Sequence, residues 1–384
     1  MKIAVVTGTR AEFGLLAPLM HKIEASQLLD LITMVTGTHL LPDFGYTVED
    51  IKSEGFAVDA TIPEIASARD GADVARQVGS GILGFTDALV SLEPDALVLL
   101  GDRYELLSAA TAAFFLEVPI VHLHGGEVTE GAFDDTIRHA ISKFASVHAV
   151  AAPEYRDRLI RAGEQPASVH VVGGFGVDLV ATTNRFTRSE LEAELGIAIG
   201  EQLLLVTYHP VTAAPHETQQ EIDALVAALG KFPDATVVFT LPNADPEHDI
   251  ISAAISKAVS KNDAWHSFPS FGSRKYLSLM ALSAVVVGNS SSGLLEAPSL
   301  GIPSVNIGPR QDGRLKAASV LSSPAEASAI EHHLRHAMSQ DFMNHLSAPE
   351  TPYGGEGAVE RVMRLLESTA FDNLGHKKYF DVTG

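Results

Sequence analysis

Short runs of apolar residues alternate along the whole chain with longer stretches whose hydrophobic residues recur at helical spacing. The short runs are almost continuously hydrophobic and do not alternate apolar with polar residues. This pattern is typical of parallel strands covered by helices on both faces of a sheet. Strand–helix alternation of this kind therefore predicts doubly wound α/β domains.

The first half of the chain contains one such series. Its predicted strands are Ile3–Thr7, Leu31–Val35, Ala96–Leu100, Ile120–Leu123, Val147–Ala151 and Val169–Val172. Its clearest helical stretches are Leu15–Glu24, Ala72–Leu89, Glu105–Phe115 and Glu154–Arg161.

The pattern changes near residue 180, where a polar, glycine-punctuated stretch includes a predicted helix at Arg188–Leu195. A second series follows. Its predicted strands are Leu203–Thr207, Thr236–Thr240, Ala284–Val287 and Ser304–Ile307. Its predicted helices are Thr218–Leu229, Pro246–Ser260, Arg274–Leu282, Gly293–Leu300 and Glu326–Met338.

These series predict one domain at residues 1–180, a second at 181–356, and a tail at 357–384 that opens with an amphipathic helix, Gly357–Leu366. In open α/β sheets, ligands bind beyond the carboxyl ends of the strands. Two such domains in tandem predict a ligand cleft between them. Functional residues are therefore expected directly after strands.

The composition excludes several classes of site. The chain of 384 residues has no cysteine, which excludes disulfides, cysteine-ligated zinc, iron–sulfur clusters and thiol nucleophiles. Its 27 basic and 48 acidic side chains give a net charge of −21, so nucleic acid and anionic membranes are poor partners. A membrane-spanning helix needs about 18 consecutive apolar residues without charge, and no segment approaches this length. The first apolar run stops at Gly8, which indicates a buried strand instead of a signal peptide, and we expect a cytoplasmic protein.

The segment from Thr7 to Gly14, TGTRAEFG, joins the first predicted strand to the first predicted helix. Glycine together with Arg10 at a helix N-terminus is an arrangement that can bind phosphate. The segment lacks both the G-x-G-x-x-G and the G-x-x-x-x-G-K-[ST] signatures. Phosphate binding and a tight turn with a solvated arginine are equally supported.

The strongest local feature is GNSSSGLLEAP at 288–298, which follows a hydrophobic strand and opens a helix. Ser290, Ser291 and Ser292 can cap the helix and offer hydroxyl groups to phosphate oxygens. Glu296, one turn later, can accept hydrogen bonds from ribose hydroxyls. Because one serine is enough for capping, three serines favour anion binding over capping alone.

Carboxylates follow strands of the first predicted domain. Asp102 and Arg103 come directly after the strand that ends at Leu100, where Asp102 can act in the cleft or cap the next helix. Asp134 and Asp135 open a later helix. Paired carboxylates at a helix start are common dipole partners, but here they add to a dense set of proton-transfer groups.

The next strand ends in HLHGGE, residues 122–127. Strand alternation predicts that His122 and His124 lie on one face, and the two glycines permit close approach of backbone to a ligand. His-x-His can also bind a metal, but no partner follows at metal-ligand spacing, so we expect none. Histidine can instead exchange a proton near neutral pH.

The strand ends of the second predicted domain are polar as well. His209 follows its first strand, Asn243 and Asp245 its second, and Arg310 its last. A structural protein has no reason to place polar or titratable residues at nearly every strand end. The sequence therefore predicts a nucleotide held by the second domain and acid–base groups supplied by the first.

Together these motifs resemble the hydrolysing UDP-N-acetylglucosamine 2-epimerases of the sialic-acid type. They also resemble the related enzymes that act on UDP-2,4-diacetamido-2,4,6-trideoxy sugars in legionaminic acid synthesis. The resemblance spans residues 2 to about 314 and, in order along the chain, rests on TGTRAEFG, VTGTH, GDRYE, HGGEVTEGAFDDTIRH, YHP, GNSSSGLLEAPSLGIP and GPRQ. So many ordered matches are far more specific than any one motif.

The resemblance implies a GT-B-type fold of two Rossmann-like domains, with the C-terminal helix packed back on the first, and a homodimer. It implies cleavage of the sugar–diphosphate bond with inversion at C2, which releases UDP and a free manno-configured sugar; no metal or redox cofactor is needed. The residues at positions matched to catalysis are Asp102, His124, Glu127, Asp134, Arg138 and His209. The residues at positions matched to substrate or UDP binding are Arg10, Gly14, His39, Arg103, Asn243, Phe271, Ser290, Ser291, Ser292, Glu296 and Arg310.

His124 departs from the family pattern, because many members carry a glutamate there as a third catalytic acid. Some relatives have histidine, and the third role stays open between His124 and Glu127. Two sugars stay open as well, N-acetylglucosamine and N,N′-diacetylbacillosamine.

Three other functions stay open. A GT-B glycosyltransferase predicts a basic or apolar membrane-docking patch, and this acidic chain has no such run. A non-hydrolysing epimerase keeps UDP on the sugar, and the HGGE…DDTIRH form argues against it. A catalytically inactive sugar-nucleotide-binding protein has support only from His124.

Overall fold

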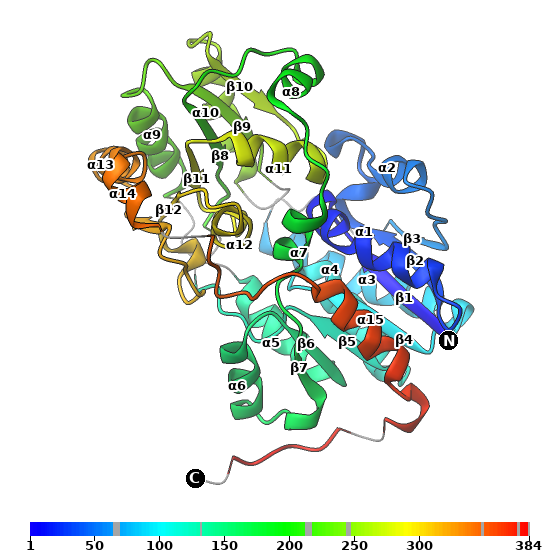
Figure 1. Cartoon of the computed structure of the whole chain (residues 1–384). Helices are drawn as coiled ribbons and strands as arrows, with labels where there is room; N and C mark the ends of the chain where they lie inside the picture. Colours follow the sequence, from blue (N-terminus) through cyan, green and yellow to red (C-terminus); the bar gives the residue numbers. More distant parts are fainter. Residues whose placement is uncertain are drawn as a thin grey trace. The chain divides into compact units, whose positions relative to one another are not determined.

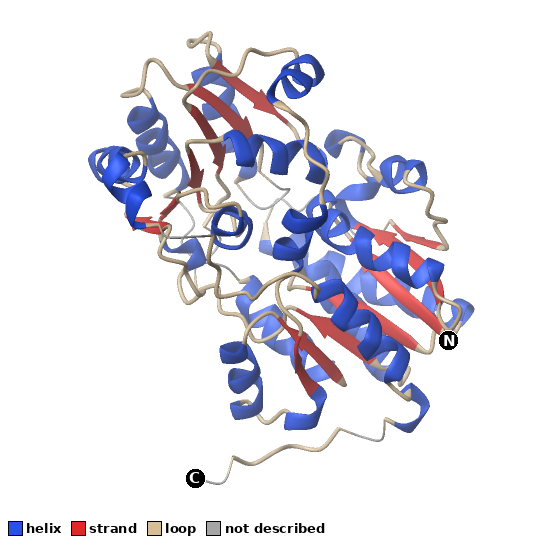
Figure 2. Cartoon of the chain, viewed as in Figure 1, coloured by secondary structure: helices blue, strands red, loops and turns tan. Residues whose placement is uncertain are grey.

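The computed structural model describes residues 1–63, 70–130, 133–211, 217–242, 247–346, 349–374 and 377–382. Contacts within the chain divide it into two units. Unit 1 comprises Met1–Glu127, Asp134–Asp178 and Tyr353–Gly384, and unit 2 comprises Val128–Phe133 and Leu179–Pro352. Each unit is built on its own parallel sheet (Figure 2).

The described part of unit 1 contains a seven-stranded parallel sheet in the order β3-β2-β1-β4-β5-β6-β7. The strands are β1 (Lys2–Thr7), β2 (Asp30–Thr36), β3 (Ala60–Ile62), β4 (Ala96–Leu100), β5 (Ile120–Leu123), β6 (Val147–Val150) and β7 (Val169–Val171). The strand order reverses between β1 and β4, which makes their carboxyl ends the expected ligand position of this sheet.

Helices cover both faces of the unit 1 sheet (Figure 1). Alternate residues of β1 belong to two separate hydrophobic clusters. One cluster includes buried side chains of α1 (Arg10–Ala25) and α15 (Ala358–Ser368), and the other those of α3 (Gly71–Leu92) and α4 (Tyr104–Phe115). The remaining helices of this region are α2 (Val48–Ser53), α5 (Asp134–Phe144), α6 (Pro153–Arg161) and α7 (Phe175–Thr182), the last of which leads into unit 2.

Helix α15 brings the C-terminal part of the chain back to unit 1, where it packs beside α1 (Figure 1). Lys22 and Glu360 form an ion pair at 2.6 Å. The Asp178 carboxylate accepts hydrogen bonds from the backbone N–H groups of Gly357 at 2.5 Å and Val359 at 2.8 Å. A carboxylate at the start of a helix satisfies N–H groups that have no partner within the helix and is favoured by its dipole.

The described part of unit 2 contains a six-stranded parallel sheet in the order β10-β9-β8-β11-β12-β13. The strands are β8 (Leu203–Thr207), β9 (Thr236–Thr240), β10 (Trp265–Phe268), β11 (Val285–Gly288), β12 (Ser304–Ile307) and β13 (Val320–Ser323). The helices are α8 (Arg188–Leu195), α9 (Thr218–Leu229), α10 (His248–Val259), α11 (Gly272–Leu282), α12 (Ser292–Ser299), α13 (Ala327–Ala337) and α14 (Gln340–His345). Buried residues of α9, α10 and α13 share one hydrophobic cluster with the sheet, and those of α8, α11 and α12 share another.

The strands predicted from hydrophobic runs are confirmed, each within one residue of its expected bounds. The strands that were missed are β3, β10 and β13, and all three lie at sheet edges. An edge strand has a partner on one side only and is less buried, so it does not need the continuous apolar run that marks a central strand.

Helix α1 corrects the predicted glycine-rich turn. It begins at Arg10 and not at Leu15, and its N-cap Thr9 accepts a hydrogen bond from the Glu12 N–H through its side chain. Gly14 therefore lies inside the helix. The other predicted helices are confirmed within about two residues, except that α3 ends three residues later than predicted, at Leu92; the Pro246 end of one lies outside the described residues. Helices α2, α7 and α14 were not predicted.

Candidate functional site

Asp102 lies at the carboxyl end of β4, next to the strand-order reversal of unit 1. Helix α4 begins at Tyr104, and its N-cap is Arg103, which makes no side-chain capping bond. The alternative role of Asp102 as a helix cap is therefore wrong. Its carboxylate accepts a hydrogen bond from the guanidinium of Arg138, which lies on α5.

Arg138 is the centre of this cluster. Its side chain is 1% exposed, and it also donates to the Glu127 backbone carbonyl at 3.0 Å and to Asp135 Oδ1 at 3.1 Å. Asp134, the first residue of α5, is half-buried beside it. A planar guanidinium with several donors can fix carboxylates in one geometry, so the strand end of β4 and the start of α5 are held together.

His124 and Glu127 form the second part of the cluster. His124 Nδ1 lies 3.0 Å from Glu127 Oε1, and His124 Nε2 accepts the backbone N–H of Phe175 at 3.2 Å. Because Nε2 is the acceptor, the neutral ring carries its proton on Nδ1 and donates it to Glu127. Both side chains are buried, at 8% and 2% exposed.

The prediction that His122 and His124 share one face is wrong. Strand β5 ends at Leu123, and His124 has a φ of +61°, which breaks the alternation. The His122 ring points toward α5, where Nδ1 lies 3.0 Å from Ser142 Oγ and Nε2 lies 2.7 Å from the Gly101 carbonyl oxygen. Burial lowers the pKa of His122 to about 3, so its ring is neutral at physiological pH.

Glu12 lies at the β1–α1 turn and was not among the predicted site residues. Its Oε2 accepts the Gly8 N–H at 2.9 Å. Burial raises the pKa of Glu12 to about 7, against the opposing effect of Arg103 and with a contribution from Glu105. A carboxyl group that already accepts this N–H competes with a phosphate for it. The structure therefore favours a tight turn over phosphate binding here.

Arg10, Arg103 and His39 have protein partners around this turn. Arg10 pairs with Asp50 at 3.3 Å, and Arg103 donates to Glu105 from Nε at 3.3 Å and from Nη2 at 3.2 Å. His39 is fully buried, and its ring nitrogens lie 3.0 Å and 2.6 Å from the hydroxyl oxygens of Thr7 and Thr47. Burial lowers the pKa of His39 to about 4.

In unit 2, Asn289 ties three strand ends together. It follows β11 and is fully buried. Its Oδ1 accepts the backbone N–H of His209 at 2.7 Å, and its Nδ2 donates to the His209 carbonyl at 2.8 Å. The Asn289 carbonyl accepts from Arg310 at 3.2 Å and from Gln311 at 2.7 Å. His209 and Arg310, predicted from two separate strands, therefore share one scaffold residue.

The serine segment lies where β11 leads into α12. Gly288 has a φ of +130°, and a Cβ there would lie 1.9 Å from the Thr207 carbonyl oxygen, so the turn requires glycine. Ser291 is the N-cap of α12, but its side chain makes no capping hydrogen bond. Ser290 Oγ accepts the Ser292 N–H at 3.4 Å, so helix capping accounts for at most one of the three serines.

The serine hydroxyls belong to a row of uncharged groups. Ser292 Oγ lies 3.0 Å from Ser290 Oγ and 2.6 Å from the Tyr276 hydroxyl. Tyr276 lies 3.4 Å from Thr207 Oγ1, which accepts from Thr240 at 2.7 Å. Hydroxyl hydrogens can turn toward an acceptor, so the N-terminal end of α12 presents donors that suit an anion.

The structure also shows buried Asn306, which no motif marked. Its side-chain amide has no hydrogen-bond partner among the described residues. It lines a cavity of about 10 Å³ beneath the serine segment, together with Ser290 and Ser304.

The remaining predicted residues are placed as follows. Glu296 lies on α12, one turn after the serines. Phe271 is the N-cap of α11, 9% exposed, and its ring packs against Phe268 with centroids 4.8 Å apart. Asn243 lies outside the described residues. Among the described residues, no group of three or more histidine and acidic side chains is placed to hold a metal ion.

The structure thus gathers predicted residues within each unit. Asp102, Arg138, Glu127 and His124 form one connected cluster in unit 1. His209 and Arg310 meet at Asn289 in unit 2. No helix in the described ranges is long and apolar enough to cross a membrane.

The chain matches the family model described as UDP-N-acetylglucosamine 2-epimerase over residues 21–367. It is 36% identical over 383 residues to the GDP/UDP-N,N′-diacetylbacillosamine 2-epimerase (hydrolyzing) of Campylobacter jejuni, covering 99% of each chain. It is 34% identical over 369 residues to the UDP-N,N′-diacetylbacillosamine 2-epimerase (hydrolyzing) of Legionella pneumophila, covering 96% of each chain.

The fold is similar to that of solved structures. A crystal structure of UDP-GlcNAc 2-epimerase from Neisseria meningitidis bound to UDP-GlcNAc aligns with a TM-score of 0.81 at 18% identity, covering 96% of this chain and 100% of that chain. The expected fold class is confirmed as α/β of the GT-B type, with two Rossmann-like parallel sheets.

Proposed function

The chain belongs to the UDP-N-acetylglucosamine 2-epimerase family, and on that premise we propose that it is a hydrolysing UDP-sugar 2-epimerase. It converts a UDP-activated 2-acetamido sugar and water into UDP and the free sugar with inverted C2. The observation that carries the proposal is the cluster of Asp102, Arg138, Glu127 and His124 at the carboxyl ends of the unit 1 strands.

We favour UDP-N,N′-diacetylbacillosamine over UDP-N-acetylglucosamine as the substrate. Both full-length relatives reported above are named for N,N′-diacetylbacillosamine. The Campylobacter relative is named for GDP as well as UDP, so the test must also compare guanine with uracil as the base of the nucleotide.

The chemistry requires the bond to the nucleotide to break first. The hydrogen on C2 of an N-acetyl sugar is hardly acidic while C1 carries the diphosphate. When the C1–O bond breaks, its electron pair leaves with UDP, and the oxocarbenium-like C1 makes the C2 hydrogen acidic. Loss of that proton gives a 2-acetamidoglycal. Water then adds its oxygen to C1. A proton is delivered to C2 on the face opposite to the one from which the first proton was removed, which inverts C2.

Unit 2 suits the leaving group. The row of hydroxyls at α12 provides donors to a diphosphate, and His209 and Arg310 are held nearby by Asn289. Donors that are already in place stabilise developing charge without reorganisation in the transition state. Glu296 accepts hydrogen bonds from the ribose.

Unit 1 supplies the proton-transfer groups. Asp102, fixed by Arg138, and Asp134 are two of them. We assign the third to Glu127 and not to His124, because the Nε2 lone pair of His124 already accepts the Phe175 N–H. His124 then orients the Glu127 carboxylate through its Nδ1 proton.

The test is turnover in D₂O with UDP-N,N′-diacetylbacillosamine, its GDP counterpart and UDP-N-acetylglucosamine, followed by proton NMR. We expect release of UDP and a free manno-configured sugar deuterated at C2, fastest with the diacetamido substrate. Faster turnover of UDP-N-acetylglucosamine would overturn the choice of substrate but not the proposed reaction.

Other outcomes would overturn the reaction itself. Release of UDP without C2 exchange would indicate a glycosyltransferase that leaks to water. An epimerised sugar still attached to UDP would indicate a non-hydrolysing epimerase. UDP binding with no reaction of any substrate would indicate an inactive binding protein.

A further inference from the structure

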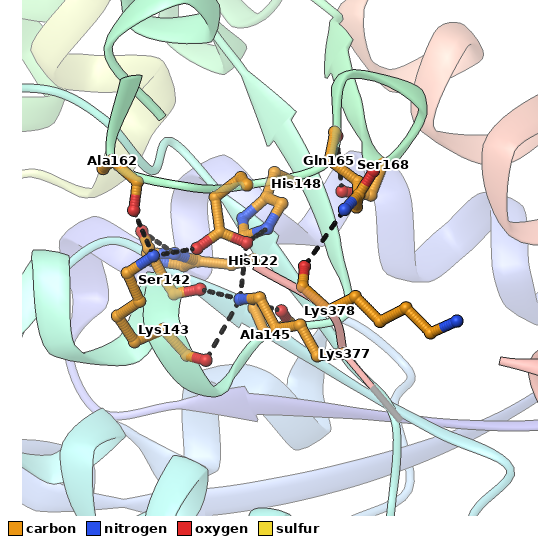
Figure 3. Close-up of polar contacts among 11 residues, drawn as sticks. His122, Ser142, Lys143, Ala145, His148, Ala162, Gln165, Ser168, Lys377 and Lys378 are labelled. Atoms are coloured by element: carbon orange, nitrogen blue, oxygen red, sulfur yellow. Dashed lines mark hydrogen bonds and ion pairs between the residues drawn. The ribbon is translucent and has the colours of Figure 1, made fainter. Parts of the chain in front are cut away.

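The C-terminal tail is anchored to unit 1 by one lysine. Lys377 Nζ donates to the backbone carbonyls of Ser142 at 2.8 Å, Lys143 at 3.0 Å and Ala145 at 2.8 Å, which lie at the last turn of α5 (Figure 3). The last carbonyls of a helix have no partner within it, and a cation there also suits the helix dipole. Lys377 therefore caps the C-terminal end of α5.

A buried carboxylate holds this lysine in place. Glu164 is fully buried, and its oxygens lie 2.6 Å from Lys377 Nζ, 2.7 Å from Lys143 Nζ and 3.0 Å from His148 Nε2. Burial alone would raise the pKa of Glu164, but the hydrogen bonds from His148, Lys143 and Lys377 lower it to about 2. A charged group that is buried in this way is costly to leave without its partners.

The residues that follow this anchor make further contacts. The Lys378 carbonyl accepts from Gln165 at 3.2 Å, and the Phe380 N–H donates to the Gly163 carbonyl at 2.9 Å. Lys143 Nζ lies 5.4 Å from the centroid of the Tyr379 ring. The Lys378 side chain, by contrast, points away from the cluster (Figure 3).

Helix α5 connects this anchor to the candidate active site by two routes. In the first, the Ser142 hydroxyl donates to His122 Nδ1 at 3.0 Å, and His122 Nε2 donates to the Gly101 carbonyl at 2.7 Å. The carbonyl can only accept, so the neutral His122 ring must donate from Nε2. In the second, Arg138 of the same helix holds the Asp102 carboxylate. Gly101 and Asp102 are consecutive, so both routes converge on one loop.

We propose that Lys377 is a positioning residue that fixes the C-terminal turn of α5 and thereby sets the place of Asp102. The inference rests on the proposed function, in which Asp102 transfers a proton. Lys377 touches no reacting atom. Its effect is on the geometry in which the reaction starts, and a misplacement of about 1 Å can cost about 100-fold in rate.

The experiment compares full-length Lys377→Met, Lys377→Arg and Lys378→Met with the wild type. Lys378→Met is the matched control, because it removes a neighbouring exposed ammonium that has no part in the cluster. We expect Lys377→Met to lower kcat by roughly 10- to 100-fold while KM and the Kd for UDP stay unchanged. Lys377→Arg, which keeps the charge and the donors, recovers most of the loss.

A second variant tests the route through α5. Ser142→Ala removes the hydroxyl that contacts His122 but leaves the backbone carbonyl that Lys377 uses. We expect Ser142→Ala to lower kcat, as Lys377→Met does. The double variant with Lys377→Met should lose less than the product of the two single losses, because both act on the same loop.

Hydrogen–deuterium exchange gives a readout that does not depend on the reaction. In Lys377→Met, exchange should accelerate in peptides that cover 134–146 and 101–107, and in Lys378→Met it should not. Acceleration confined to 377–382 would overturn the proposal. So would a kcat equal to that of Lys378→Met, or a parallel loss of kcat and UDP affinity. If the wild type turns over no UDP-sugar, the proposed function fails, and the exchange result decides the inference alone.

Discussion

The carboxyl ends of the two sheets are built from different chemistry. In unit 1 they carry charged or titratable groups that hold one another, with Arg138 bonded to Asp102 and Glu127 bonded to His124. In unit 2 the bonded groups are mainly neutral amides and hydroxyls, with Asn289 bonded to the His209 backbone and Ser292 to Tyr276, and Arg310 is the charged group that donates to Asn289.

The difference separates two tasks that a hydrolysing epimerase must perform. Moving protons requires groups that can change charge, and burial makes the position of each such group critical. Binding a leaving anion requires donors that stay in place and keep their charge state. The comparison predicts that changes in unit 1 act on turnover and on pH dependence, while changes in unit 2 act on affinity and on local stability.

The largest expected effect is on turnover. Asp102→Asn should lower kcat by about 10²- to 10⁴-fold, the usual contribution of a proton-transfer group, and leave UDP affinity unchanged. Steady-state kinetics and calorimetric titration with UDP measure the two quantities. Asp135→Asn, which also removes a carboxylate beside Arg138 but is 25% exposed, should cost less than about tenfold. A fully active Asp102→Asn variant would break the comparison.

The next effect is on the stability of unit 2. Asn289→Ala removes the two hydrogen bonds to the backbone N–H and carbonyl of His209, whereas Asn306→Ala removes a buried amide that has no hydrogen-bond partner among the described residues. We expect Asn289→Ala to cost about 1–3 kcal/mol more in the free energy of unfolding than Asn306→Ala. Trp265, the single tryptophan, lies in β10 and reports on unit 2 by fluorescence in urea. An equal loss of unfolding free energy in the two variants would show that the hydrogen bonds of Asn289 do not stabilise unit 2.

A further effect is on affinity. Ser290→Ala combined with Ser291→Ala should weaken UDP binding by about 1–3 kcal/mol, the range for lost charge-assisted hydrogen bonds. Ser299→Ala is the control, because that hydroxyl bonds the Leu295 carbonyl at the other end of the same helix. Unchanged UDP affinity in the double variant would remove the serine segment from the binding site.

The smallest expected effect is on the pH profile of stability. The pKa of Glu12 is about 7 in the folded chain and 4.5 as an ordinary glutamate, so the folded state binds the proton more tightly. Its contribution is complete below pH 4.5 and is lost as the pH rises through 7. Glu12→Gln should flatten the decline in urea midpoint between pH 5 and 8. Glu24→Gln, an exposed position on the same helix, should not.

Much of this architecture could be predicted from the sequence. Central strands are buried on both faces, so a continuous apolar run identifies them and their bounds. Edge strands such as β3 and β13 lack that run. The start of α1 was placed too late because Gly14 suggests a turn, yet the cap at Thr9 starts the helix before it.

The site could be predicted as a set of residues but not as a set of contacts. Motifs and strand ends marked Asp102 and Arg138, which stand 36 residues apart, but only the fold shows that they bond. The left-handed backbone of His124 could not be predicted, because only a few per cent of residues other than glycine have a positive φ. Lys377 lies in a polar tail with no hydrophobic periodicity, so the sequence could not predict its contact with the backbone carbonyls of α5.

The short segment Val128–Phe133 belongs to unit 2, although unit 1 contains the chain on both sides of it. The Glu130 N–H donates to the Asp312 carbonyl at 3.0 Å, and Arg314 donates to Thr129 Oγ1 at 3.2 Å. The domains are therefore not modules that a single cut can separate. A chimaera that exchanges unit 2 with that of a relative must therefore also exchange this six-residue segment, or the segment will face side chains of a different sequence.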